Sequence, residues 1–295
     1  MDYRQTVKKL VGEKGQVKLV YYKALLQKEP MAAAMKVLPD NRRFFNIHRG
    51  ERCFVIGNGP SLKSVDLSLL KDEQVFTVNY FNKMKDYQAA HTNYHFWVDS
   101  MFFNGRDDVH ADMAEVMESY SAIAQEKCEC FLPVSAYGFL KEKKLLPSIK
   151  PNFLYIDGML ANGQKLKMDL ANIITPYTTV VQYAITAAIY MGFSEIYLLG
   201  CDSTYLMGLF HKLLEVKDDE MHAYRNDNSE KQVEEIIGKW SMPEILNDQY
   251  LLFLGYEKLY QYCKERGIKL VNCSRQTVVT SIPRASMEQV LREGK

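Results

Sequence analysis

Seven short apolar runs, each four or five residues long, recur along the chain and predict β-strands. Nearly every position in these runs is apolar, with no alternation of polar and apolar residues, as is typical of strands buried on both faces of a sheet. The predicted strands are 53–56, 75–78, 95–98, 129–132, 152–156, 195–199 and 269–272.

Segments with helical periodicity separate most of these strands, most clearly 108–126, 180–191 and 245–266. The last of them is followed by Gly267, in the position of a C-cap. Strands that alternate with helices predict a parallel sheet covered on both faces. We therefore expect an α/β, Rossmann-like fold, in which ligands bind at the carboxyl ends of the strands.

A glycine-rich turn, Gly57-Asn58-Gly59-Pro60-Ser61, follows the first predicted strand. Both glycines allow positive φ and close approach of an anion to the backbone, and a following helix would present its positive end to that anion. Pro60 suits a first helical turn, and Asn58 or Ser61 is a candidate N-cap. The spacing fits neither a dinucleotide fingerprint nor a Walker loop, because Lys63 and Ser64 stand where further glycine or Gly-Lys-Ser would be needed. An ordinary β-turn-α connection is the alternative.

Polar residues also follow other strands, and parallel strands bring these ends to one edge of the sheet. An asparagine or aspartate there is suited to ribose or base contacts, a metal, or capping of the next helix. The candidates are Asn79, Asp99, Ser100, Gly200, Asp202, Ser203, Thr204 and Tyr205.

With 295 residues and 47% hydrophobic content, the chain can bury a substantial core. It has no apolar run of 18 residues, and its first residues lack the core of a signal peptide, so we expect a cytoplasmic protein. The cysteines are expected to be reduced and mostly buried, and Cys128 and Cys130 share a strand face without further metal ligands nearby. We expect no metal site and no cofactor.

Residues 1–50 contain eleven Lys and Arg against four Asp and Glu, a net charge of +7 in a chain whose total is +1. We interpret 1–48 as a basic helical arm preceding a catalytic domain at 49–295. The arm is suited to peripheral contact with an anionic membrane at the inner face of the plasma membrane, or to packing on the core with a solvated lysine face. Its basic residues match no nucleic-acid-binding motif, so nucleic acid is not expected as a partner.

Two sequence blocks carry a resemblance to a known family. HRGERCFVIGNGPSL at 48–62 with FTVN at 76–79, and GFSEIYLLGCD at 192–202, resemble the sialyltransferase-like proteins of glycosyltransferase family 42. The first block, with FTVN, resembles even more closely the related 6-hydroxymethylpterin diphosphokinase-like proteins, and the second block is similar to both groups. The resemblance spans roughly 49–284, with shorter matches at 272–274 and 282–284, and leaves out the arm.

The resemblance implies a modified GT-A fold that acts as a metal-independent inverting glycosyltransferase. The implied donor is a CMP-linked sugar, sialic-acid-like or Kdo-like, and the implied acceptor is a bacterial surface glycan or glycolipid. The sequence leaves the oligomeric state open, with a homo-oligomer as one alternative. In that family the glycine-asparagine-glycine loop and a later asparagine hold the nucleotide, a histidine is the general base, and tyrosines donate to the departing phosphate. Carried over, the resemblance places Gly57, Asn58, Gly59, Ser61 and Asn79 at the donor site, Asp202 after the second block, and His222 as the base. Together with the strand-end candidates, the predicted substrate-binding residues are Gly57, Asn58, Gly59, Pro60, Ser61, Asn79, Asp99, Ser100, Thr178, Thr179, Gly200 and Asp202, and the predicted catalytic residues are His222, Tyr205 and Tyr224.

These residue types fit the chemistry. An imidazole removes a proton from an acceptor hydroxyl near neutral pH, and His222 lies in a polar segment suited to this, with His211 as its rival. A tyrosine hydroxyl stabilises the charge that grows on the departing phosphate. The chain departs from the family pattern at Thr178-Thr179, where a Thr-Ser-Gly run is expected, and at the second tyrosine, near which Phe210 falls.

Two other functions compete with this one. A diphosphokinase that transfers pyrophosphate from ATP to a pterin alcohol would need Mg²⁺, for which Asp99 and Asp202 are candidate ligands. A nucleotide-binding module without catalysis is the other alternative.

Overall fold

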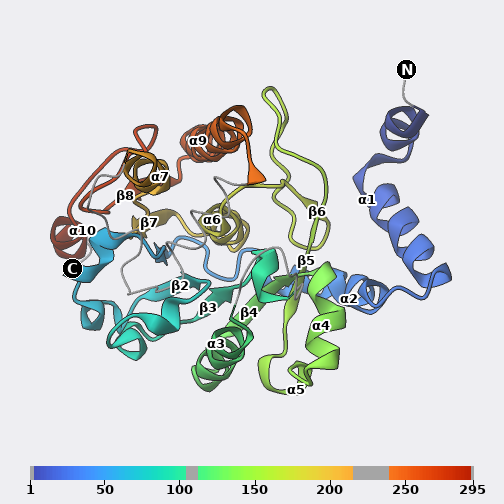
Figure 1. Cartoon of the computed structure of the whole chain (residues 1–295), viewed down its shortest axis with the longest axis horizontal. Helices are drawn as coiled ribbons and strands as arrows, with labels where there is room; N and C mark the ends of the chain where they lie inside the picture. Colours follow the sequence, from blue (N-terminus) through green and yellow to red (C-terminus); the bar gives the residue numbers. More distant parts are fainter. Residues whose placement is uncertain (1–2, 104–111, 215–238, 294–295) are drawn as a thin grey trace.

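The protein folds around one eight-stranded parallel sheet, seen in a computed structural model that describes residues 3–103, 112–214 and 239–293 (Figure 1). The strand order is β6-β5-β4-β3-β2-β1-β7-β8, and every neighbouring pair is parallel. The strands are β1 (Arg52–Ile56), β2 (Gln74–Val78), β3 (Tyr94–Phe96), β4 (Glu129–Pro133), β5 (Asn152–Ile156), β6 (Ile173–Ile174), β7 (Glu195–Leu199) and β8 (Lys269–Asn272).

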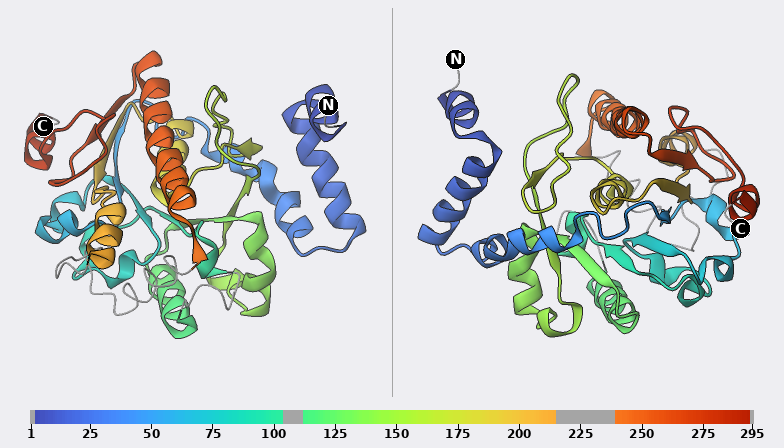
Figure 2. Two further views of the ribbon diagram at one scale, coloured as in Figure 1. Left: turned by 45° about the horizontal axis from the view of Figure 1, so that its top comes forward. Right: turned by 180° about the vertical axis from the view of Figure 1, so that it is seen from behind.

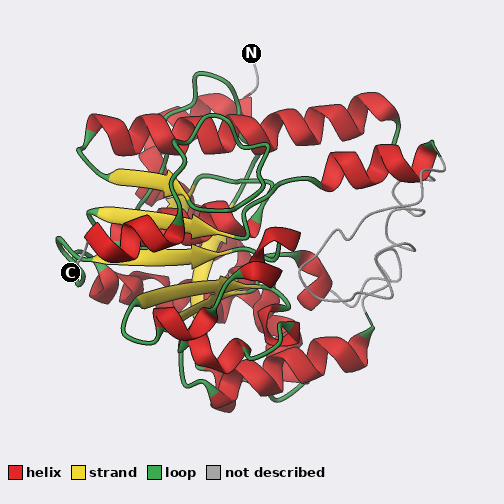
Figure 3. Cartoon of the chain, turned by 90° about the vertical axis from the view of Figure 1, so that its left-hand side faces the viewer, coloured by secondary structure: helices red, strands yellow, loops and turns green. Residues whose placement is uncertain are grey.

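Helices cover both faces of this sheet (Figure 3). One face packs against α6 and α9, and the other against α2, α3, α4 and α10. The α-helices are α1 (Tyr3–Leu26), α2 (Met31–Val37), α3 (Met113–Gln125), α4 (Tyr137–Glu142), α5 (Leu146–Ile149), α6 (Val180–Tyr190), α7 (Tyr205–Leu213), α9 (Met242–Glu265) and α10 (Met287–Glu293).

The alternation of side chains along β1 shows how the two layers arise. Phe54 and Ile56 point into the core on the α3 side, whereas Cys53 and Val55 point into the core on the α6 side. Successive residues of a strand face opposite sides of the sheet, so a strand buried on both faces must be apolar throughout. The predicted α/β, Rossmann-like fold is therefore confirmed.

All seven predicted strands are present, and the largest difference in a boundary is at β3, which ends at Phe96 rather than at residue 98. The two-residue strand β6 escaped prediction because Ile173 and Ile174 are too short a run to show a period. The helix expected over 108–126 is α3, which begins after Asp112, whose carboxylate accepts a hydrogen bond from the Ala114 amide at 2.8 Å. Residues 108–111 of that prediction lie outside the described residues.

The helix predicted over 245–266 begins earlier, at Met242, because of a capping box that the prediction missed. The Ser241 amide and hydroxyl both donate to the Glu244 carboxylate, each at 2.7 Å. At its other end Gly267 has the positive φ, +68°, that a glycine after a helix was expected to supply.

Helical structure also fills most of the basic N-terminal segment. Ala34, Met35 and Leu38, in α2 and the 3₁₀ helix that follows it, belong to the core on the α3 side of the sheet. Asn41 is buried, and its amide donates to the carbonyls of Phe153 and Leu170 at 2.6 and 2.9 Å. The domain boundary between 48 and 49 stays a prediction. Within the described residues, no helix combines the length and the apolar character needed to cross a bilayer.

Candidate functional site

A pocket of about 330 Å³ opens at the carboxyl ends of the central strands, where ligands were expected. Its volume falls in the range of small-molecule sites. Its walls come from the ends of β1, β2 and β7, from the segment after β3, and from parts of α6, α7 and α9. The lining residues are Gly57, Asn58, Gly59, Val78, Asn79, Tyr80, Asp99, Met101, Thr179, Val180, Val181, Gly200, Cys201, Asp202, Ser203, Thr204, Tyr205, Leu252 and Tyr256.

Most of the sequence-predicted site residues meet in this pocket. Those that line it are Gly57, Asn58, Gly59, Asn79, Asp99, Thr179, Gly200, Asp202 and Tyr205. Those that do not are Pro60, Ser61, Ser100 and Thr178, together with His211 on α7. His222 and Tyr224 lie outside the described residues, so their roles stay predictions.

The glycine-rich turn packs directly against the end of β7. The Gly57 amide donates to the Leu199 carbonyl and the Gly59 amide to the Gly200 carbonyl, both at 2.8 Å. A Cβ on Gly57 would lie 2.5 Å from the Gly200 carbonyl oxygen, and one on Gly59 would lie 2.6 Å from the Cγ of Asp202. Both positions must therefore be glycine, because another part of the same chain occupies the space.

Asp202 holds the turn in place. It is 2% exposed, its Oδ2 accepts from the Ser61 amide at 2.7 Å, and its Oδ1 accepts from the Ser61 hydroxyl. Burial raises the pKa of the Asp202 carboxyl, and the two hydrogen bonds from Ser61 oppose that rise. This role was not among those expected for Asp202: its carboxylate joins the turn after β1 to the end of β7 through two hydrogen bonds from Ser61.

The turn is followed by a helix, as expected, with Pro60 in its first turn, but it is a five-residue 3₁₀ helix, Pro60–Ser64. Neither glycine uses the positive φ that glycine allows. No side chain caps this helix, because Asn58 and Ser61 make their hydrogen bonds elsewhere. The amides of Gly57, Gly59 and Ser61 donate within the protein, so they do not face an anion as we had predicted.

Two asparagines present unpaired acceptor atoms in the pocket wall. The Asn58 amide nitrogen donates to the Val78 carbonyl at 3.0 Å, which fixes the side chain between β1 and β2. Asn79 adopts the left-handed conformation with φ of +50°, and its backbone amide donates to Phe96 at 3.0 Å. Both side-chain oxygens are buried without a hydrogen-bond partner among the described residues. A buried polar atom without a partner is costly, so these oxygens are suited to a ligand that carries donors.

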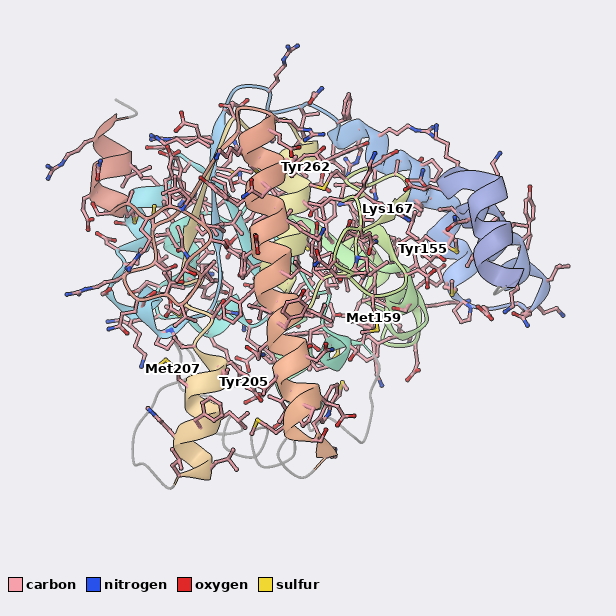
Figure 4. The ribbon with its side chains drawn as sticks, turned by 90° about the horizontal axis from the view of Figure 1, so that it is seen from above. Tyr155, Met159, Lys167, Tyr205, Met207 and Tyr262 are labelled. Atoms are coloured by element: carbon pink, nitrogen blue, oxygen red, sulfur yellow. The ribbon has the colours of Figure 1, made fainter. Side chains whose placement is uncertain are left out.

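Tyr205 supplies a donor to the same pocket. It begins α7 beside α9, where it packs near Leu209 and Ile245 (Figure 4). Its hydroxyl is buried and unpaired among the described residues. Burial, with a smaller effect from Asp248, raises its pKa to about 12, so the hydroxyl keeps its proton at neutral pH.

Asp99 shows the capping role that was one of its expected functions. Its carboxylate accepts from the Met101 amide at 3.1 Å, at the start of the 3₁₀ helix Ser100–Phe102. Desolvation raises the pKa of the Asp99 carboxyl, and the hydrogen bond from the Met101 amide opposes that rise. The described residues contain no group of three His, Cys, Asp or Glu side chains arranged to hold a metal ion.

The start of α6 forms part of the pocket wall, and it contains Thr179, one of the predicted site residues. Thr179, Val180 and Val181 line the pocket, and no side chain caps the helix there. The first amides of an α-helix have no partner within the helix and lie at its positive end, which attracts anions. Val180 and Val181 were not among the predicted site residues, unlike Thr178 and Thr179 before them, because an apolar side chain gives no chemical signal of a ligand contact.

Comparisons with known proteins place the chain at a distance from characterised ones. No protein-family model matches the sequence, and no curated protein matches it. A solved structure of the sialyltransferase CstII from Campylobacter jejuni in complex with cytidine-5′-monophosphate is similar, with 19% identity and a TM-score of 0.43. A second CstII structure, in complex with CMP-3FNeuAc, has 16% identity and a TM-score of 0.41. In both comparisons the matched region covers 80% of this chain and 86% of the CstII chain.

Proposed function

We propose that the chain is an inverting glycosyltransferase that uses a nucleotide-activated sugar without a metal ion, and that the donor is CMP-linked. One observation carries the proposal. The Asn58 and Asn79 oxygens and the Tyr205 hydroxyl, all buried and unpaired among the described residues, line one pocket at the carboxyl edge of a parallel sheet. The choice of cytidylate and of a sialic-acid-like or Kdo-like sugar rests on the sequence blocks at 48–62 and 192–202.

The polar groups of the pocket match the parts of such a donor. The asparagine oxygens suit donors such as ribose hydroxyls or the amino group of a base. The first-turn amides of α6, at Val180 and Val181, bind the phosphate. The sequence analysis had assigned this contact to the glycine-rich turn. Tyr205, which keeps its proton, donates to the phosphate oxygen as it departs.

The reaction then proceeds by displacement at the anomeric carbon. The acceptor hydroxyl oxygen forms the new bond while the bond from the anomeric carbon to the phosphate oxygen breaks, and CMP leaves with that electron pair. A base removes the hydroxyl proton, and His222 remains our candidate, with His211 as the rival. Thr179, beside the phosphate contact, is suited to the sugar.

The magnesium-dependent diphosphokinase fits these residues less well. Both carboxylate oxygens of Asp202 accept hydrogen bonds from Ser61 in a site that is 2% exposed, and Asp99 caps a helix. A Mg²⁺ ion would have to displace those contacts to use either carboxylate.

Ligand binding is the first test. We expect CMP to raise the melting temperature more than UDP, GDP or ATP, with or without Mg²⁺. Asn79→Gly keeps the left-handed backbone but removes the amide, and should weaken CMP binding about 5-fold to 30-fold for one or two lost hydrogen bonds. Asn46→Gly is the matched control, because Asn46 also has positive φ, +57°, but is exposed and does not line the pocket.

Catalysis is the second test. Hydrolysis or transfer of a CMP-sugar should persist in EDTA, and Tyr205→Phe should lower kcat about 100-fold with little change in CMP affinity. Tyr250→Phe, at an exposed position of α9, is the control and should keep the original kcat. His222→Ala and His211→Ala decide the base, since only one of them should abolish transfer. Turnover that depends strictly on ATP and Mg²⁺ would replace the proposal with the kinase, and nucleotide binding without turnover would replace it with the module.

A further inference from the structure

The helix α1 carries an apolar surface that faces away from the protein. The helix stands at one side of the molecule, joined through α2 (Figure 2). Val17, Val20, Tyr21 and Ala24 turn toward the protein core. The opposite side presents Leu19, Tyr22, Leu25 and Leu26, which are 51%, 58%, 51% and 84% exposed.

Lysines border this strip. At 100° per residue, Leu25, Tyr22, Leu26 and Leu19 cover an arc of about 120° on the exposed side. Lys14 and Lys23 fall at its two margins and Lys18 falls within it, and all three side chains are exposed. The acidic residue within α1, Glu13, pairs with the body of the protein instead, with its Oε1 3.6 Å from the Lys167 Nζ. Lys167 is labelled in Figure 4.

We propose that this surface of α1, made of Leu19, Tyr22, Leu25 and Leu26 with Lys14, Lys18 and Lys23, binds an anionic membrane surface. A helix with leucines and an aromatic on one strip and lysines beside it lies in the plane of the headgroups. The long lysine stems reach around the apolar strip and place their ammonium groups among lipid phosphates.

The charge of the segment argues against a second copy of the chain as the occupant. Residues 1–50 carry a net charge of +7, so pairing two copies through α1 would bring two strongly basic segments together. An anionic surface instead neutralises that charge. The proposal does not depend on the glycosyltransferase activity, because it concerns membrane binding alone.

Flotation of the full-length protein with vesicles tests the proposal. We expect binding to vesicles that contain phosphatidylglycerol, weak binding to phosphatidylcholine alone, and release at high salt. Lys18→Gln/Lys23→Gln should lower the partition coefficient about 25-fold, from roughly 5-fold for each lysine. Leu25→Ser/Leu26→Ser should lower it at least about 10-fold.

Leu69→Ser provides the matched control. Leu69 is 50% exposed, as Leu19 and Leu25 are, but it lies in a 3₁₀ helix far from α1 in the sequence, and its loss should leave vesicle binding unchanged. Circular dichroism of each variant verifies that the fold is kept. Equal binding to neutral and anionic vesicles, or unchanged binding in both α1 variants, would overturn the proposal. A dimer in sedimentation velocity that Leu25→Ser/Leu26→Ser abolishes, without vesicle binding, would assign the surface to a second copy instead.

Discussion

Ser61 donates both its backbone amide and its hydroxyl to the carboxylate of Asp202, which lies 141 positions later in the sequence. This double contact joins the turn after β1 to the end of β7 at the wall of the pocket. Because Asp202 is buried, its hydrogen bonds from Ser61 are what makes an aspartate tolerable there. The shape of the pocket wall therefore depends on this pair.

Removing the Ser61 hydroxyl should destabilise the protein. Ser61→Ala keeps the amide bond to Asp202 but leaves the Oδ1 without its donor in a buried site. Such an unpaired atom costs about 1–3 kcal/mol in the free energy of unfolding, measured by urea denaturation. Ser68→Ala is the control, since Ser68 makes a similar bond to Asp66 on the surface, and should change stability by no more than about 0.5 kcal/mol. Equal losses in the free energy of unfolding for the two variants would contradict the argument that burial makes the Ser61–Asp202 pair more important than an exposed one.

Adding one methyl group to the turn should disturb both stability and ligand binding. In Gly59→Ala the new Cβ would lie 2.6 Å from the Asp202 Cγ and 2.7 Å from the Gly200 carbonyl oxygen, so the turn and the end of β7 must separate. We expect a loss of about 1–3 kcal/mol in the free energy of unfolding and weaker CMP binding in the same preparation.

Gly138→Ala serves as the comparison for that variant. A Cβ on Gly138, within α4, would come no closer than 3.4 Å to its neighbour Pro30, and alanine favours a helix. This change should be neutral or stabilising by up to about 1 kcal/mol. Normal stability in Gly59→Ala would contradict the packing argument.

The fold could be predicted because the strands of a sheet buried on both faces are recognisable as short apolar runs in the sequence. Each of the longer strands is largely apolar. Strand β6 could not be recognised in this way because it has only two residues. Asn58 and Asn79, which the rule about carboxyl ends predicted at one edge of the sheet, line the same pocket.

The reason for the two turn glycines could not be predicted, because it depends on contacts between distant parts of the chain. Gly59 was interpreted as leaving room for an anion, but the space that a Cβ would take is occupied by Gly200 and Asp202. Likewise Val180 lacks any chemical signal, and only its place at the start of a helix beside the pocket makes its amide a candidate phosphate contact.

A proline at the first position of α6 would test that phosphate contact. Val180→Pro removes one amide hydrogen, and the position tolerates proline because Thr179 before it is extended, with φ of −126° and ψ of 142°. We expect CMP binding to weaken about 10-fold or more, for the loss of a hydrogen bond to a charged group. Cytidine, which lacks the phosphate, should bind variant and original protein equally. A parallel loss for cytidine and CMP would mean that the helix start contacts the nucleoside or only shapes the pocket.

Buried His95 should make the protein less stable as the pH falls. The imidazole is fully buried, with its Nδ1 2.7 Å from the Thr77 hydroxyl, and burial lowers its pKa from 6.5 to about 3 against a raising effect of the Asn79 backbone. Below pH 6.5 the unfolded chain therefore binds a proton that the folded chain does not. The free energy of unfolding should fall with decreasing pH by up to about 1.4 kcal/mol per pH unit, until the pH reaches the folded pKa.

The raised pKa values of Asp99 and Asp202 act in the opposite direction, because their folded forms take up a proton at a higher pH than the unfolded chain does. The contribution of His95 is therefore measured by comparison with His95→Gln. The quantity compared is the slope of the free energy of unfolding against pH, between pH 4 and 6. We expect the shallower slope in His95→Gln, whereas His91→Asn, at an exposed position with positive φ, should keep the original slope. Nuclear magnetic resonance gives a second measurement that does not need the variant. A ring signal from His95 that titrated near pH 6.5 in the folded protein would contradict the buried neutral state.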